Sequence, residues 1–375
     1  WTSEVHAPAE AGTDGSALEQ AGASFRTYRA LYPYWRLDPR QRATLVASGG
    51  NLFSFDEVWR LASDRRASIV HTHAIGRLGG VVRLGARLRG TPYAVTLHGP
   101  VRANSEVVRQ DVARRAATMT DLGAPLGWLV GARRVVREAN LVFVLNPAEH
   151  AAWKQDRQGR HLELTRHGVD PTPATAAARR AARARIPAVG DAGFVAVIGR
   201  LDATKGQDIA IDAYLRGCAP DHHLVLVGSV ADPDYAEALN RAIGGKGRVH
   251  VVGGVCPEVA RGFLAECSLA LMPSRAESFG LALLEAWAEG APALHSAAEG
   301  FAAIARNTGS TATLVDSTSP QAWAARIRQT LGDAALLERE RREGPRRVQL
   351  RYSWRAVAGE VARAYRSATL EGDAP

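Results

Sequence analysis

Short apolar runs alternate with longer amphipathic stretches in the first half of the chain. The apolar runs are SIVHTHA (68–74), YAVTLHG (93–99) and LVFVLN (141–146), with helical patterns at 77–89 and 131–140 between them. Strand-length runs separated by helix-length segments are typical of βαβ units and a parallel sheet. Before them, residues 24–37 contain a strand candidate, and FSFDEVWRLASD (53–64) has the pattern of a capped helix.

The second half repeats the alternation after a break in composition. Residues 171–193 are rich in Pro, Ala and Arg, which indicates an interdomain connection with one short basic helix. The predicted strands that follow are 194–199, 223–228, 248–253, 269–273, 291–296 and 312–315. They predict a second doubly wound sheet, in which ligands bind beyond the carboxyl ends of the strands.

Composition narrows the class of protein. The 375 residues are 46% hydrophobic, enough for two domains with their own cores. The net charge of +9 comes almost entirely from dispersed Arg, and aromatic residues are only 6%, so a nucleic-acid partner is not favoured. Attraction to anionic lipid or to a phosphorylated substrate remains open, beside a merely solvated basic surface.

Cysteine usage and hydropathy point to a cytoplasmic protein. The three cysteines form neither a metal-binding spacing nor an even disulfide set, which fits a reducing compartment. No apolar run approaches the ~18 residues needed to span a bilayer. No GxGxxG opens either half, which argues against a dinucleotide dehydrogenase.

The stretch PSRAESFGLALLEAWAEG (273–290) carries two carboxylates at a strand-to-helix turn. With Ser278 as the predicted N-cap, the first amides of the helix have no intrahelical acceptor and face the ligand crevice. Glu277 lies at the mouth of that crevice, and Glu285 lies about two turns along the helix, where an acidic side chain suits a ribose diol. The alternative is an ordinary amphipathic helix with Glu285 at its solvent edge. The amides belong to Phe279, Gly280 and Leu281.

A second loop adds two cations. FVAVIGRLDATKG ends a predicted strand at Gly199 and continues with Arg200 and Lys205. A compact ammonium and a bidentate guanidinium both suit phosphate. Surface charges beside a turn are the alternative.

Together these segments resemble the nucleotide-binding domain of family-four retaining glycosyltransferases, which have the GT-B fold. The resemblance covers most of 194–331 and is carried, in order, by GRLDATKG, LVLVGS, VHVVGGV and ESFGLALLE. The fold that it implies is α/β, with two doubly wound Rossmann-like domains facing a cleft. The domains expected are residues 1–180 on the acceptor side, 181–345 for the nucleotide sugar, and 346–375 as a helix that returns to the first domain.

The resemblance implies a role for each loop. Arg200 and Lys205 would hold the donor diphosphate, and Glu285 the nucleotide ribose. Glu277 and the amides of 279–281 would hold the donor sugar and distal phosphate. The expected catalytic residues are His98, Arg200, Lys205 and Glu277. The expected donor-binding residues are Gly199, Arg200, Lys205, Gly228, Val252, Gly253, Ser278, Phe279, Gly280, Leu281 and Glu285, with the base near 252–255.

The first half resembles the acceptor domain of the same family. IVHTHA and YAVTLHG match its strand ends, and the resemblance places His98 opposite the donor sugar. LTRHGVDP (164–171) is similar to the family's crossing segment, and residues 352–368 to its terminal helix. His71 and His73 share one face of a strand and are interpreted as structural, because two imidazoles make a poor zinc site.

Three features qualify the resemblance. After the strand at 291–296 the family has a Gly-Gly pair and a Glu, whereas this chain has EGFAAI (299–304), which puts that loop's ligand contacts in doubt. Residues 1–4 align with the end of the family's second strand. On that alignment the opening strand, loop and helix are absent, and we expect nucleotide binding with poor sugar transfer. The acidic pair Asp232 and Asp234 imitates a metal motif but is interpreted as a helix cap.

The expected function is therefore a retaining, metal-independent hexosyltransferase without a cofactor. It would move a sugar from a nucleotide diphosphate to a hydroxyl acceptor, lipid-linked or small, in the cytoplasm or at the inner face of an anionic membrane. Its cations would do the work of a metal ion. The rival classes are a nucleotide-sugar-binding protein without turnover and a nucleotide-sugar epimerase.

Overall fold

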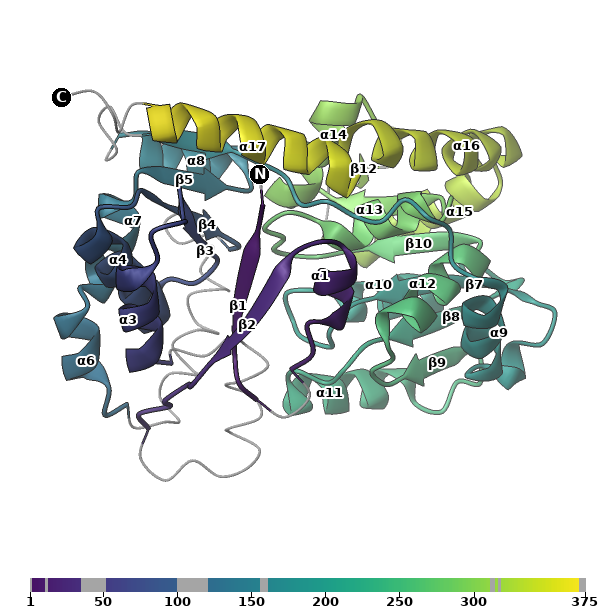
Figure 1. Ribbon diagram of the computed structural model, residues 1–375. Helices are drawn as coiled ribbons and strands as arrows, with labels where there is room; N and C mark the ends of the chain where they lie inside the picture. The colour runs from purple at the N-terminus through teal and green to yellow at the C-terminus, as the bar shows by residue number, and fades with distance from the viewer. Residues whose placement is uncertain are drawn as a thin grey trace.

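The computed structural model describes residues 2–10, 13–34, 52–99, 121–155, 161–310, 314–315 and 318–370. Two α/β bodies lie side by side, and the last two helices run along one edge of both (Figure 1). Below, the body that contains strands β1–β6 is called the first domain, and the body that contains β7–β12 the second domain.

The second domain is built on one parallel sheet of six strands in the order β12-β11-β10-β7-β8-β9. The strands are β7 (Gly193–Ile198), β8 (His222–Val227), β9 (Val249–Val252), β10 (Leu269–Met272), β11 (Ala293–Ser296) and β12 (Leu314–Val315). The strand order reverses between β7 and β10, which makes this pair the topological switch point. The crevice of such a sheet opens there, so the loops after β7 and β10 are placed to hold a ligand.

Helices cover both faces of this sheet, and each face has its own hydrophobic core. One core centres on Phe263, Trp287 and Phe301, and the other on Ile211 and Trp323. Burial of such large apolar side chains is the main favourable term in folding. The helices are α9 (Ala176–Ala184), α10 (Gln207–Leu215), α11 (Pro233–Ile243), α12 (Pro257–Glu266), α13 (Leu281–Ala288), α14 (Glu299–Thr308), α15 (Pro320–Leu331) and α16 (Ala334–Arg351). The short basic helix expected within 171–193 is α9.

The first domain has a parallel sheet of four strands in the order β3-β4-β5-β6. The strands are β3 (Val70–Thr72), β4 (Tyr93–Leu97), β5 (Leu141–Val144) and β6 (His161–Leu164). The helices of this part are α3 (Phe55–Ser63), α4 (Gly76–Arg89), α6 (Ala124–Leu129), the 3₁₀ turn η1 (Ala132–Arg134), α7 (Val135–Glu138) and α8 (Pro147–Lys154). Strands β3, β4 and β5 lie where the apolar runs predicted them. The capped-helix prediction at 53–64 is confirmed, because Ser54 Oγ accepts from Glu57 N at 3.3 Å.

The helical stretch expected at 131–140 is shorter and less regular than predicted, since it consists of the 3₁₀ turn η1 and the one-turn helix α7. Gly131 adopts the left-handed conformation, with φ 64°, and separates α6 from the short turns that follow. A left-handed residue cannot continue an α-helix, so α6 does not run on into the helical turns of 132–138. Strand β6 was not predicted.

Strands β1 (Glu4–Pro8) and β2 (Ser24–Tyr28) form a separate parallel pair, joined by α1 (Ser16–Gln20). Figure 1 shows them in purple at the centre of the view. Strand β1 begins at Glu4 instead of ending there, so the alignment of residues 1–4 places the strand too early. Strand β2 confirms the candidate within 24–37. Among the described residues, neither strand pairs with β3, β4, β5 or β6.

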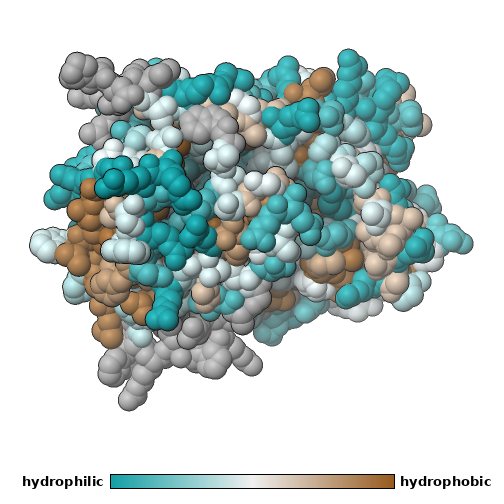
Figure 2. Space-filling view, in the orientation of Figure 1, coloured by the Kyte–Doolittle hydropathy of each residue, from teal (hydrophilic) through white to brown (hydrophobic). Residues whose placement is uncertain are grey.

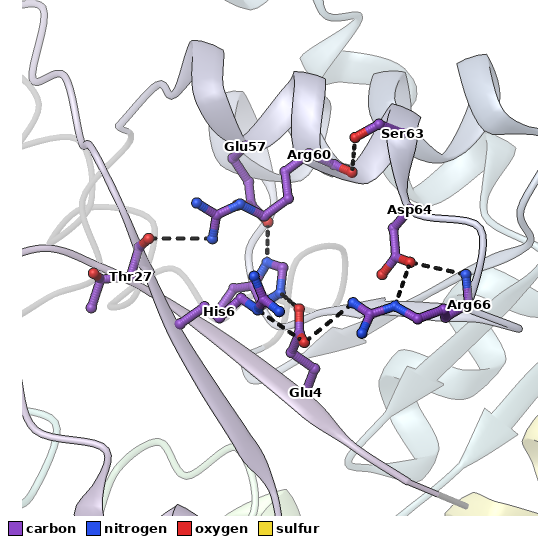
Figure 3. Close-up of polar contacts among 9 residues, drawn as sticks. Glu4, His6, Thr27, Glu57, Arg60, Ser63, Asp64 and Arg66 are labelled. Atoms are coloured by element: carbon purple, nitrogen blue, oxygen red, sulfur yellow. Dashed lines mark hydrogen bonds and ion pairs between the residues drawn. The ribbon is translucent and has the colours of Figure 1, made fainter.

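Side-chain charges connect the β1–β2 pair to the rest of the first domain (Figure 3). Glu4 contacts His6 at 2.8 Å, Arg26 at 3.0 Å and Arg66 at 3.6 Å. His6 also binds the buried carboxylate of Glu57 on α3, at 2.5 Å. Hydrogen bonding to Glu57 is the main reason that the pKa of His6 is raised.

The C-terminal helix α17 (Trp354–Leu370) returns from the second domain to the first (Figure 1). Its residues Tyr365 and Ala368 pack against Leu141 and Phe143 of β5. Where the chain crosses in the other direction, Val169 N donates to Tyr352 O at 2.8 Å. The chain thus passes between the domains twice, and the two crossings are hydrogen-bonded to each other.

Candidate active site

A cavity of about 780 Å³ lies between the two domains. Its first-domain wall comes from residues that follow strands β4, β5 and β6. Its second-domain wall comes mainly from the loops after β7 and β10 and the first turns of α13. The lining includes His98, Gly99, Asn146, Ala148 and His167 on one side, and Gly199, Arg200, Lys205, Arg275, Glu277, Ser278, Phe279, Gly280, Leu281, Glu285 and Glu299 on the other.

The two loops at the switch point bring the predicted cations and a carboxylate together. Lys205 Nζ lies 2.8 Å from Glu277 Oε2. Arg200 lies 3.3 Å from Asp202 and is more than half exposed, so its guanidinium is accessible from the cavity. The sequence separates Lys205 and Glu277 by 72 positions, and their meeting confirms that both loops open on one crevice.

Arg275 connects these two loops through hydrogen bonds. Its guanidinium makes two hydrogen bonds to Asp208, at 2.8 and 2.6 Å, and one to Ala203 O at 3.0 Å. Such a bidentate pair fixes direction as well as distance. Burial alone would raise the pKa of Asp208, but the hydrogen bonds that Asp208 accepts from Arg275 and from the hydroxyl of Tyr235 lower that pKa. The loop that carries Lys205 is thereby tied to the loop that carries Glu277.

Glycine permits the close approach of the strand ends. A Cβ at Gly206 would lie 2.2 Å from Pro273 O, and one at Gly228 would lie 1.9 Å from Gly199 O. A side chain at either position would therefore push the loop that carries Arg200 and Lys205 away from the neighbouring strand end.

The predicted N-cap at Ser278 is wrong. Helix α13 begins at Leu281 and its N-cap is Gly280, with φ 107°. A Cβ at Gly280 would also lie 2.6 Å from the ring of Phe301, so packing requires glycine there as much as ligand access does. Phe279 is buried in the core and pulls the backbone inward before the helix starts. Ser278 instead accepts, through its carbonyl oxygen, a hydrogen bond of 3.1 Å from Asn146 of the first domain.

Glu285 is the half-buried carboxylate of this wall. Burial raises its pKa, Arg261 opposes that shift and Glu289 adds to it. Within the described part of the chain, no hydrogen bond or ion pair is recorded for its carboxylate, whereas Glu289 pairs with Arg261 at 2.5 Å. A carboxylate that is partly desolvated and lines a cavity can accept hydrogen bonds from ligand hydroxyls.

Two family models match the chain in tandem. The model described as "Glycosyl transferase 4-like domain" matches residues 1–161, and "Glycosyl transferases group 1" matches residues 178–347. D-inositol 3-phosphate glycosyltransferase 1 of Catenulispora acidiphila is 30% identical over 322 residues, which cover 81% of this chain and 73% of that protein.

The chain belongs to the GT-B glycosyltransferases of family four.

Other relatives agree with this assignment. The D-inositol 3-phosphate glycosyltransferase of Geodermatophilus obscurus is 30% identical over 275 residues, and the match spans 69% of this chain and 60% of that relative's length. HepE of Anabaena, solved in complex with UDP, superposes with a TM-score of 0.69 at 19% identity, covering 97% of this chain and 92% of that one. Sucrose-phosphate synthase of Thermosynechococcus elongatus superposes with a TM-score of 0.65 at 24% sequence identity. The superposition covers 95% of this chain and 92% of that one. The two structures establish the shared fold of paired Rossmann-like domains.

Three expected donor-binding residues do not line the cavity of this glycosyltransferase. Gly228 allows the close approach to Gly199, and Val252 is buried in the core. Gly253 is not among the residues that line the cavity. The position of the base therefore stays a prediction.

The loop that departs from the family pattern packs beside the site. Gly300 N donates to Glu277 O at 3.0 Å, and a Cβ at Gly300 would lie 2.6 Å from Phe279 N. Glu299 lines the cavity and pairs with Arg306 at 2.9 Å. The close approach of Gly300 supports the backbone of the loop that carries Glu277.

Sequence reasoning missed two residues of the first-domain wall. Asn146 follows β5 and His167 follows β6, and both line the cavity. Their position in the sequence could have identified them, because side chains that follow the carboxyl ends of parallel strands gather at one edge of the sheet. From the sequence, His167 is assigned to the crossing segment alone, because the pattern does not predict strand β6.

The described residues contain no group of three or more His, Cys, Asp or Glu side chains arranged to hold a metal ion. Asp232 caps α11 by accepting from Tyr235 N at 3.1 Å, which confirms the cap interpretation of the acidic pair. No helix in the described ranges is long and apolar enough to cross a membrane.

Proposed function

We propose that this glycosyltransferase moves a sugar, with retention of configuration, from a nucleotide diphosphate sugar to a hydroxyl acceptor. The observation that carries the proposal is one interdomain cavity that holds the Lys205–Glu277 pair, the accessible guanidinium of Arg200 and the half-buried Glu285. Those side chains supply cations for a diphosphate and carboxylates for sugar and ribose hydroxyls. The Anabaena relative in complex with UDP supports a nucleotide donor of this kind.

In the proposed reaction Lys205 and Arg200 bind the diphosphate, Glu285 the ribose and Glu277 the donor sugar. The acceptor oxygen attacks the anomeric carbon on the face from which the diphosphate leaves. The bond between that carbon and the diphosphate oxygen breaks, its electron pair stays with the leaving oxygen, and that oxygen takes the proton of the acceptor hydroxyl. Lys205 and Arg200 stabilise the charge that develops there. No protein nucleophile and no metal ion takes part.

A donor and acceptor panel tests the proposal. Donors with different bases and sugars, UDP-glucose among them, are incubated with hydroxyl acceptors, including D-inositol 3-phosphate because several relatives are named for it. We expect release of the nucleoside diphosphate together with a new glycoside. Binding without products would favour the rival binding protein. A donor with an altered sugar would favour an epimerase.

We further propose a lipid-linked or membrane-proximal acceptor at the inner face of the membrane. The support is the net charge of +9 and a set of exposed apolar side chains in the first domain. Figure 2 shows apolar surface in brown at the left edge, over the region of α3, α4 and α6. Co-sedimentation with anionic vesicles, but not with neutral ones, is the expected result. The exposed residues include Phe55, Trp59, Leu88, Trp128 and Leu129.

A further inference from the structure

Four histidines form a row that leads from the sheet of the first domain to the second domain. The ring centroids of His71 and His73 are 4.5 Å apart, and those of His73 and His98 are 5.1 Å apart. His98 stacks on His167 at 5.1 Å with an interplanar angle of 9°. His167 then meets the ring of Phe279 edge-to-face at 5.2 Å. The row therefore ends against the loop that precedes α13.

Hydrogen bonds connect three members of this row. His73 Nδ1 lies 2.9 Å from His98 Nε2, and His98 Nδ1 lies 3.3 Å from His167 Nε2. His71 belongs to a different network, in which its nitrogens bind Thr96 and Tyr365. Residues His73, His98 and His167 are called the relay below.

The relay leaves His98 without a free ring nitrogen. A neutral imidazole has one donor and one acceptor nitrogen, and both nitrogens of His98 are bound by neighbouring imidazoles. Within the described chain, the relay nitrogens without a recorded hydrogen bond are His73 Nε2 and His167 Nδ1. Only His167 of these two residues lines the cavity. The nitrogen placed for a ligand is therefore Nδ1 of His167.

The relay also couples the tautomer of His167 to those of His98 and His73. When His73 donates to His98, His98 donates to His167, and His167 Nδ1 carries a proton and is a donor. When the direction reverses, His167 Nε2 carries the proton and Nδ1 becomes an acceptor. The tautomer of each ring is thus fixed by the hydrogen bond that its other nitrogen makes.

We propose that His167 is the imidazole that hydrogen-bonds a hydroxyl of the bound substrates, and that His98 and His73 are positioning residues which fix its ring plane and tautomer. This inference rests on the proposed function. His98 also lines the cavity, and the expectation that it faces the donor sugar stays a prediction.

The relay is held neutral by its surroundings. Burial, followed by the proximity of His98 and His73, lowers the pKa of His167 to about 4. Burial and then His98 lower the pKa of His73, and burial lowers that of His98. The charged groups around the relay are Arg166, which pairs with Glu360 of α17, and the cavity residues Arg200, Asp202, Lys205, Arg275, Glu277, Glu285 and Glu299.

Phenylalanine variants separate hydrogen bonding from ring packing. His167→Phe keeps a ring against His98 and Phe279 but removes both nitrogens. We expect UDP-glucose-dependent transfer to fall about 10- to 100-fold, while UDP affinity stays within about twofold, because the ring positions a hydroxyl without binding the nucleotide. Wild-type transfer in His167→Phe would overturn the assignment.

His73→Phe tests the positioning role. The variant keeps the ring contacts and cuts the bond to His98. Because His73 lowers the pKa of His167, its removal raises that pKa, so the acid limb of the pH–rate profile moves to higher pH. The matched control is His250→Phe, which cuts a 2.8 Å bond in the stacked His223–His250 pair of the second domain. The control should leave rate and profile unchanged, and identical profiles in both variants would exclude the relay.

A readout without activity keeps the inference independent of the proposed function. ¹⁵N NMR of the histidine side chains reports the tautomer and pKa of each ring. We expect one dominant tautomer for His98 and His167 in the wild-type protein, and mixed tautomers with a raised His167 pKa in His73→Phe. Unchanged spectra in that variant would refute the relay even if transfer is observed. The expected spectra together with no transfer would refute the proposed function and leave the relay standing.

Discussion

The two domains of this glycosyltransferase are held together in different ways. In the second domain six strands form one continuous sheet between two hydrophobic cores, and glycines and Arg275 fix the loop that carries Arg200 and Lys205. In the described part of the first domain the strands form two separate sheets, and ionic contacts of His6 and Glu4 connect the β1–β2 pair to α3 and to Arg66. The second domain is therefore held by packing, which depends little on pH. The first domain has hydrophobic cores of its own, but the attachment of its β1–β2 pair includes groups that titrate.

The largest expected effect concerns two residues of the second domain. Lys205→Ala and Arg200→Ala each remove a cation to which we assign, in the proposed function, stabilisation of the leaving diphosphate. Loss of a charge-assisted contact of this kind costs on the order of 3 kcal/mol, or ~10²-fold in transfer rate. The matched control is Lys246→Ala, an exposed lysine of the same domain outside the cavity. Near wild-type turnover in both cavity variants would remove the diphosphate assignment.

Glu285 and Glu277 of the second domain are expected to act on different parts of the donor. We expect Glu285→Gln to weaken binding of the free nucleoside diphosphate, and Glu277→Gln mainly to slow sugar transfer. Because burial raises the pKa of Glu285 above its ordinary 4.5, nucleotide affinity should already decline under mildly acidic conditions. Glu285→Gln should abolish that decline. Calorimetric titration across pH measures both effects, and equal losses of affinity in the two variants would disprove the division of roles.

The sequence predicted the second domain more fully than the first. Apolar runs predicted all six strands, and the positions of Lys205 and Glu277 after two of those strands predicted that both line one crevice. The start of α13 was mispredicted because an N-cap rule applied to Ser278 cannot foresee that Phe279 is drawn into the core. In the first domain, β6 is short and partly exposed, so its pattern is weak. The relay was missed with it, since its members come from three separate strand ends and meet only in the folded chain.

A smaller effect is expected where the β1–β2 pair meets α3. Hydrogen bonding to Glu57 raises the pKa of His6 above its ordinary 6.5. The protonated form therefore stabilises the folded contact below about pH 6.5, and that contribution is lost as the pH rises through the folded-state pKa. Amides of β1 and β2 should exchange faster at higher pH than intrinsic exchange chemistry explains. Those of β7 and β8 should not.

Substitution provides the matching control for that measurement. Glu57→Gln should remove the excess pH dependence in β1 and β2, while Asp14→Asn, at an exposed site in the segment between them, should preserve it. The same excess in Glu57→Gln would show that another group holds the pair in place.

The smallest expected effect is that of chelation. If Lys205 and Arg200 neutralise the diphosphate, transfer should survive EDTA within about twofold. Measured rates with and without EDTA, followed by addition of Mn²⁺ or Mg²⁺, test this directly. Activity that is lost with EDTA and restored by a divalent cation would mean that Lys205 and Arg200 do not neutralise the diphosphate by themselves.

The proposed function requires that the cavity between the two domains transfers a sugar with retention of configuration. The most direct test is NMR of the products formed from an α-linked nucleotide sugar and the acceptor identified by the panel. The account predicts a free nucleoside diphosphate and a new glycoside whose anomeric signal has the small coupling of an α linkage. A β-linked product, an epimerised donor or an unchanged donor would contradict it.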